Sequence, residues 1–355
     1  MATLAPAAPL RARNGRDTVA AGAVFGFLLA AVAALNLSLG AVSVAPDDVV
    51  RALFDPERAD PAAALVVREI RLPRLLAALA VGAALAAAGA ALQALFRNPL
   101  ADPGLLGVST GSALGAALWF VAGGTLAAAA APALKPFLLP GASFAGALGA
   151  IGVVLALAAR SGPGATLLML LLGIGVNALG GACIGLLSYI STDTELRSLS
   201  VWLLGTLAQV ERPVLLVALA IVGAGLAGLL ATARELDLLA LGEEAARHLG
   251  LDVDALRQRV ALLTALCVGA AVALAGLVGF LGLVVPHVVR LWLGPGHRRL
   301  LPMAALGGAA FLALADLAAR LIALPAEVPV GIVMAFAGAP PFLWVLRSAW
   351  RRVAA

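Results

Sequence analysis

Few side chains in this sequence could do chemistry, and those that could are spread widely along it. Asp316 and Arg320 lie four residues apart, so a helix would place them on one face, where they can form an ion pair. The histidines are His248, His287 and His297. The sequence has no glycine-rich phosphate loop followed by lysine, no HExxH and no GxSxG pattern. We therefore expect no catalytic residue, and the chain could not hydrolyse ATP alone.

The two cysteines predict no metal site and no disulfide. Cys183 and Cys267 lie in the apolar runs GGACIGLL and LTALCVGA, where small buried side chains are expected. Neither has the spacing of a metal-binding motif. We expect no bound metal and no permanently bound cofactor.

The composition indicates that most of this chain is surrounded by lipid. Of its 355 residues, 63% are hydrophobic and only 12% are charged, whereas soluble domains have about 45–50% and about 25%. These values exclude a soluble enzyme, a disordered chain and a disulfide-rich module. They predict an all-α polytopic membrane protein, since one span takes about 20 residues. About ten apolar runs are found, at 18–40, 73–96, 104–127, 137–159, 165–190, 213–232, 258–275, 276–292, 301–322 and 328–346.

The basic residues predict the orientation. With both termini in the cytoplasm, fifteen of the 24 lysines and arginines fall inside and nine outside, which agrees with the positive-inside rule. The net charge of +5 therefore reflects cytoplasmic loops and gives no reason to expect nucleic-acid binding. The run 258–292 is too long for one span, and we divide it at the glycines between 276 and 282.

We expect one membrane domain, 1–355, with four polar segments. Residues 1–17 form a cytoplasmic tail. Residues 41–71 form an external segment with a short helix capped by Asp47. Residues 191–212 form a short external helix, and residues 233–259 form two short cytoplasmic helices joined at Gly250.

Four segments together carry a family resemblance. They are RLPRLLAALAVGAALAAAGAALQALFRNPLADPGLLGVSTGSALGAA at 71–117, LGEEAARHLG at 241–250, GLVGFLGLVVPHVVR at 276–290 and AEVPVGIVMAFAGAPPFLWVL at 326–346. In order and spacing they resemble the FecCD-type (type II) permeases of ABC importers, which move ferric siderophores, haem and cobalamin. The resemblance implies a homodimer of ten-helix subunits in lipid, with a translocation path along the dimer axis. It also implies two cytoplasmic ATPase subunits, which bind the ATP, and a periplasmic binding protein.

The resemblance also implies roles for particular residues. The residues implied to couple to the ATPase are Leu241, Gly242, Glu243, Glu244, Ala245, Arg247, His248, Leu249 and Gly250. Acidic residues first and basic residues last suit the dipole of a short helix there, although a solvated loop would carry the same charges.

Two further sets of residues follow from the same resemblance. Arg71, Arg74 and Arg320 are implied to dock the binding protein; the alternatives are lipid-headgroup anchoring and, for Arg320, the internal pair with Asp316. The implied gate residues are Asn98, Leu100 and Thr166, and ordinary turn and capping chemistry is the alternative. At Thr166 the sequence SGPGATLL departs from the small polar run usual in the family.

The cargo prediction depends on SYISTDTELRSLSVWLLG, which is most similar to haem-importing members. Arg197 would face the external funnel, where guanidinium groups can pair with haem propionates. Tyr189 lies near the same mouth; its two candidate roles are haem ligand and anchor at the membrane interface, and we favour the anchor. Cobalamin and ferric siderophores remain alternative cargoes. A self-contained ion-coupled transporter is an alternative of another class, and a membrane-embedded enzyme lacks a catalytic constellation. The expected location is the bacterial inner membrane.

Overall fold

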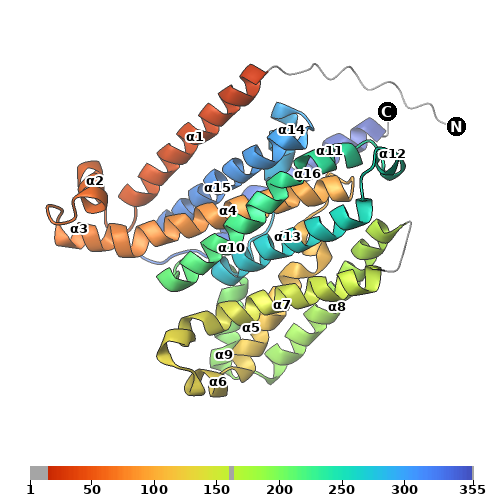
Figure 1. The fold of residues 1–355 in the computed structure, drawn as a ribbon. Helices are drawn as coiled ribbons and strands as arrows, with labels where there is room; N and C mark the ends of the chain where they lie inside the picture. Colours follow the sequence, from red (N-terminus) through yellow and green to blue (C-terminus); the bar gives the residue numbers. More distant parts are fainter. Residues whose placement is uncertain (1–14, 160–163, 354–355) are drawn as a thin grey trace.

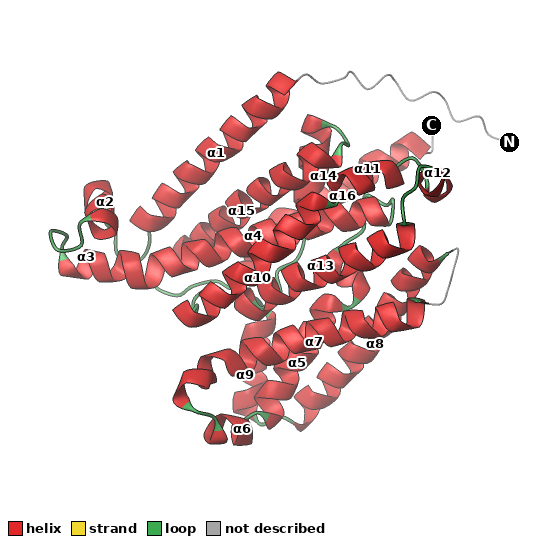
Figure 2. Cartoon of the chain, in the orientation of Figure 1, coloured by secondary structure: helices red, strands yellow, loops and turns green. Residues whose placement is uncertain are grey.

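The computed structural model describes residues 15–159 and 164–353, and all regular elements within these ranges are helices (Figure 2). Seven helical segments there are long and apolar enough to cross a membrane, and three shorter apolar helices accompany them. The ten long helices are α1 Gly15–Ser38, α4 Leu72–Leu95, α5 Val108–Ala122, α7 Lys135–Ala158, α8 Ala165–Ile190, α10 Arg212–Ala231, α13 Val253–Ala275, α14 Leu281–Leu293, α15 His297–Leu321 and α16 Val330–Val353. The all-α fold and the ten apolar helices are confirmed.

Short helices connect the long ones. They are α2 Pro46–Phe54, α3 Pro61–Leu65, η1 Val66–Arg71, η2 Pro103–Leu106, α6 Gly124–Ala129, η3 Pro132–Leu134, α9 Asp193–Leu203, α11 Ala233–Leu239 and α12 Glu243–His248. The expected tail 1–17 falls largely outside the described residues, and α1 begins at Gly15.

Helix α4 forms the centre of the bundle. It packs against α10, α13, α14 and α15 (Figure 1), and most of its residues are buried. Small residues make this packing close: a Cβ added at Gly82 would overlap the Gly308 carbonyl, and one added at Gly89 would overlap that of Gly282. In a membrane, such contacts between small residues stabilise helix pairs because they maximise van der Waals contact.

Helices α5, α7 and α8 form a second group below the first in Figure 1. Helix α5 packs against both α7 and α8, and α13 contacts α5 and α7. Only 17% of the apolar window of α8 is buried, so much of this helix faces away from the rest of the chain.

The expected division of 258–292 is confirmed. Helix α13 ends at Ala275, Gly276 follows with φ 67°, and α14 begins at Leu281. A positive φ is easiest for glycine because it has no Cβ. The reversal therefore occurs where the glycines predict it.

Two local expectations were wrong. Asp47 does not cap α2: the N-cap is Ala45, without a side-chain bond, and Asp47 lies in the first turn. The two short helices within 233–259 meet at residues 240–242, not at Gly250. Gly242 precedes α12 and Gly250 follows it, and both have a positive φ, of 115° and 86°. Gly250 therefore lies between α12 and α13. In segment 191–212, α9 is capped by Thr192 with Glu195 as its capping-box partner.

Candidate functional site

Helix α12 lies at one end of the bundle (Figure 1), and exposed apolar side chains flank it. Leu241 and Leu249 flank this helix and are 65% and 61% exposed. Ala246, between them in sequence, is fully buried and anchors the helix to the protein. The glycines at 242 and 250 let the chain turn sharply on either side. The segment is thus a short protruding helix with two large apolar side chains in solvent.

Charged residues surround these leucines. Glu244, Ala245, Arg247 and His248 are exposed. Arg247 forms an ion pair with Asp254 at 2.8 Å, and this hydrogen bond raises the pKa of the Arg247 guanidinium. The His248 Nδ1 lies 2.8 Å from the Glu244 carbonyl oxygen. Acidic residues in the first turn and basic residues in the last complement the helix dipole.

The structure brings a predicted gate residue into contact with the predicted coupling helix. The Thr166 hydroxyl donates to Glu243 Oε1 at 2.9 Å, and Arg257 Nε donates to the same hydroxyl oxygen at 2.9 Å. Arg257 also approaches Glu243 at 3.4 Å and pairs with Asp254 at 2.5 Å. Sequence reasoning missed Arg257 and Asp254, although two charges at the start of an apolar span are a signal that could have singled them out. Part of the SGPGATLL segment, 161–163, lies outside the described residues.

The turn between α4 and α5 holds the other predicted gate residues. Asn98 Oδ1 accepts the Leu100 backbone N–H at 2.9 Å, and both side chains are exposed. Leu100 lines a cavity of about 80 Å³ with His287 and Phe342 among its neighbours. Asp102 caps η2 by accepting the backbone N–H of residue 104 at 2.8 Å, and burial raises the pKa of its carboxyl. Asn98 and Leu100 thus lie on one tight turn.

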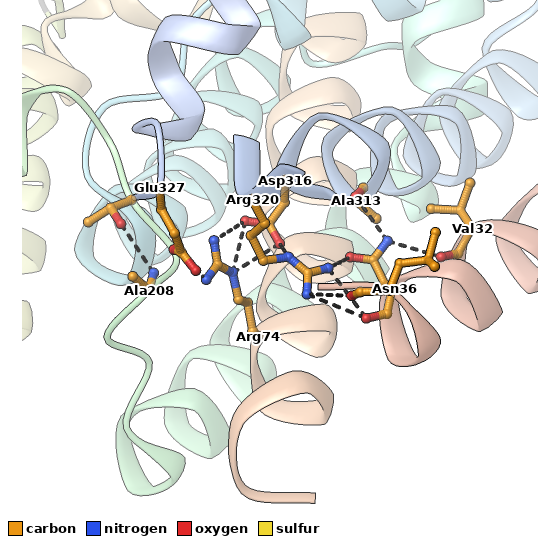
Figure 3. Close-up of polar contacts among 10 residues, drawn as sticks. Val32, Asn36, Arg74, Ala208, Ala313, Asp316, Arg320 and Glu327 are labelled. Carbon is orange, nitrogen blue, oxygen red and sulfur yellow. Dashed lines mark hydrogen bonds and ion pairs between the residues drawn. The ribbon is translucent and has the colours of Figure 1, made fainter. Parts of the chain in front are cut away.

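The three predicted docking arginines are buried and engaged within the protein. Figure 3 shows two of them, Arg74 and Arg320. Arg74 donates to Asp316 through Nε and Nη2, at 2.9–3.0 Å, and to Glu327 through Nη1, at 2.7 Å. Arg320 Nε lies 3.4 Å from Asp316 Oδ2, so the predicted i,i+4 pair forms, but Arg74 is the closer partner of the carboxylate. Arg71 donates to backbone carbonyls, at 2.6 Å for that of Leu37.

Asn36 of α1 extends this cluster. Its Oδ1 accepts from Arg320 Nη2 at 2.5 Å, and its Nδ2 donates to the Ala313 carbonyl at 3.0 Å (Figure 3). Neither Asn36 nor Glu327 was singled out in the sequence. Together the side chains join α1, α4, α15 and the loop before α16. A cavity of about 190 Å³ reaches Arg71, Arg74 and Arg320.

The predicted cargo-funnel residues are exposed. Tyr189, near the end of α8, is 87% exposed. Arg197, on α9, is also exposed and has no hydrogen bond or ion pair with the part of the chain that the structure describes. Both side chains are thus free to meet a ligand or a lipid.

These features define a polytopic membrane transport subunit with a protruding helix at one end and a buried arginine cluster at the other. The chain belongs to the FecCD transport family, whose model matches residues 28–348. It is 44% identical to the hemin transport system permease protein HmuU of Yersinia pestis over 94% of this chain and 97% of that protein. It is 43% identical to the cobalamin import system permease protein BtuC of Halobacterium salinarum, over 81% of this chain and 74% of that protein.

The fold agrees with this assignment. A solved inward-facing structure of a metal-chelate type ABC transporter superposes with a TM-score of 0.80 and 32% identity, covering 92% of this chain and 98% of that one. The protein therefore has the fold of an ABC importer permease subunit.

Proposed function

We propose that this protein is the permease subunit of an ABC importer and carries haem from the periplasm to the cytoplasm by alternating access. The assignment of haem as the cargo rests on the match to a hemin permease over nearly the full length of both chains. The cobalamin permease from Halobacterium salinarum matches over less of each chain. ATP hydrolysis belongs to a separate partner chain, because no phosphate loop is present in this sequence.

Residues 241–250 form the contact with the ATPase in this proposal. Exposed Leu241 and Leu249 supply apolar anchors, and Glu244, Arg247 and His248 supply a polar rim. This is the usual anatomy of an interface, with an apolar centre inside a polar border. The termini and this segment lie on the cytoplasmic side of the bacterial inner membrane, in agreement with the positive-inside distribution.

A homodimer supplies the translocation path. Helix α8 packs on α5, α7 and η2 and leaves an apolar face exposed. The large side chains on this exposed face are Leu167, Leu171, Ile174, Leu179 and Leu186. We assign this face to the second subunit and the remaining apolar surface of the bundle to lipid.

The binding protein docks over the arginine cluster. Three guanidinium groups, of Arg71, Arg74 and Arg320, face only two carboxylates, of Asp316 and Glu327, so the cluster has an excess positive charge. A partner carboxylate that reached into the 190 Å³ cavity would balance this excess. Since the arginines are buried, they attract a carboxylate of the binding protein only at short range, through the cavity.

The gates and funnel complete the path. Asn98 and Leu100 narrow its cytoplasmic end, and Thr166 belongs to the same end through Glu243. Arg197 and Tyr189 line the external mouth, where two symmetry-related arginines attract haem propionates.

Reconstitution tests the proposal. The chain and its partner ATPase are placed in liposomes, the binding protein delivers cargo, and ATP-dependent uptake of haem, cobalamin and a ferric siderophore is measured in parallel. We expect uptake of haem. Uptake of cobalamin or the siderophore alone would retain the permease role and refute the haem assignment. Uptake without the ATPase would refute the ABC assignment and favour an ion-coupled carrier.

A further inference from the structure

A hydrogen bond between Thr166 and Glu243 connects helices α8 and α12. Glu243 is the first residue of α12, and Thr166 is the second residue of α8. Their hydrogen bond is 2.9 Å long, and Arg257 of α13 donates to the same hydroxyl oxygen. One hydroxyl thus joins the helix that we assign to ATPase binding with α8, a long span whose apolar window is only 17% buried.

Arg257 fixes the geometry of this contact. Its side chain is only 4% exposed, and it is held by Asp254 as well as by Glu243. Asp254 also pairs with Arg247 on α12. Two basic and two acidic side chains therefore alternate from α12 to α13, without excess charge. A displacement of α12 would strain several charge-assisted hydrogen bonds at once, and such bonds are stronger than neutral ones.

Helix α8 is joined to the gate turn at a second point. Asn177 Nδ2 donates to the Gly104 carbonyl at 2.9 Å, and its Oδ1 accepts from Thr110 at 2.6 Å. A Cβ added at Gly173 would overlap the Leu105 carbonyl, so the backbones of α8 and η2 touch. This contact leaves little room for α8 to slide past the turn.

The two attachment points lie on one straight element. Eleven residues separate Thr166 from Asn177, which corresponds to about 16 Å along an α-helix. No proline interrupts this part of α8. The helix can therefore transmit a shift from its first turn to the turn that carries Asn98 and Leu100.

We propose that α8 and the 98–107 turn move as one body and that the Thr166–Glu243–Arg257 cluster couples this body to α12. Thr166 and Arg257 are positioning residues: they contact no cargo and act through Glu243 and α8. This inference rests on the proposed role of residues 241–250 as the ATPase contact. It assigns Thr166 to transmission rather than to the wall of the gate.

The test uses the reconstituted complex and the variant Thr166→Val, which removes the hydroxyl and keeps the side-chain shape. The readout is the number of cargo molecules taken up per ATP hydrolysed. Loss of a hydrogen bond to a charged group changes the equilibrium constant between two conformations about tenfold. We therefore expect the number of cargo molecules per ATP to fall about tenfold. Thr166→Ser restores the donor and is expected to recover most of the ratio.

The control variant is Ser188→Ala on the same helix, whose hydroxyl donates to the Ile184 carbonyl one turn earlier. It should leave the ratio unchanged. A second variant, Asn177→Leu, breaks the other attachment point and should also lower uptake per ATP. A wild-type ratio in Thr166→Val, or equal losses in Thr166→Val and Thr166→Ser, would overturn the proposal.

The outcomes separate this inference from the function on which it rests. Loss of ATP-dependent uptake in the wild-type complex would refute the importer assignment itself. Normal wild-type uptake, an ATPase that copurifies with Thr166→Val, and an unchanged ratio in that variant would refute only the transmission role.

Discussion

Removal of the Asp316 carboxylate is expected to destabilise this protein strongly. The Asp316 side chain is completely buried and accepts three hydrogen bonds from Arg74, through Nε to both oxygens and through Nη2 to Oδ1. Arg320 adds a weaker contact at 3.4 Å (Figure 3). Breaking a buried ion pair from one side costs about 3–5 kcal/mol, because the remaining charge is left without its partner.

The size of the effect depends on the replacement. Asp316→Ala removes both oxygens and leaves two buried arginines without this acceptor, so we expect a loss of about 5 kcal/mol in the free energy of unfolding. Asp316→Asn keeps one acceptor oxygen and the side-chain volume, and a loss of about 3 kcal/mol is expected. Unfolding in mixed micelles of a mild detergent and dodecyl sulfate measures both values.

Two controls make the measurement specific. Glu327→Gln changes the other partner of Arg74, which is 41% exposed, and should cost less than about 1 kcal/mol since water can compensate. The double variant Arg74→Met with Asp316→Leu removes both charges and should recover most of the loss. A stability of Asp316→Asn within about 0.5 kcal/mol of wild type would refute the reasoning.

Three further changes test other parts of the structure. Glutamate at both Leu241 and Leu249 places charge in an apolar interface, and the ATPase should no longer copurify; retained copurification would contradict the assignment of this surface. Gly82→Ala forces a methyl group against the α15 backbone and should lower the free energy of unfolding by about 1–3 kcal/mol, whereas Gly22→Ala, with open space around it, should not lower it. Thermal unfolding of both variants measures the difference. Arg197→Ala should lower haem uptake about two- to fivefold while exposed Arg58→Ala does not, and equal uptake in both would remove Arg197 from the funnel.

The apolar pattern predicted the helices because membrane burial is a property of continuous sequence. The runs gave all ten long helices, and Gly276 marked the reversal between α13 and α14. The charge order of 243–248 likewise predicted a short helix. The position of the joint was wrong because two glycines, 242 and 250, have positive φ, and sequence alone does not tell which of them separates two helices.

Partners distant in sequence could not be predicted in this way. Thr166 and Glu243 are 77 residues apart, and Arg74 and Glu327 are 253 apart. Each of these residues has an ordinary local setting, and only helix packing brings the pairs together. The sequence singled out Asp316 with Arg320 because that pair is local, and it therefore missed Arg74 as the stronger partner.

The distribution of contact types indicates where the subunit can change shape. The group around α4 is held by backbone contacts between glycines and by the buried arginine cluster, both of which lose much stabilisation when separated. In the last turn of α4, Gln93 donates to the Gly282 carbonyl and accepts from Arg290.

Helix α8 meets α12 through the hydrogen bond between Thr166 and Glu243, and the buried Arg257 of α13 donates to the same hydroxyl oxygen. Alternating access needs one part of a subunit to move against another while both remain folded. In our proposal, the charge-assisted contacts at α12 transmit its displacement to α8, and the group around α4 is the frame against which α8 moves.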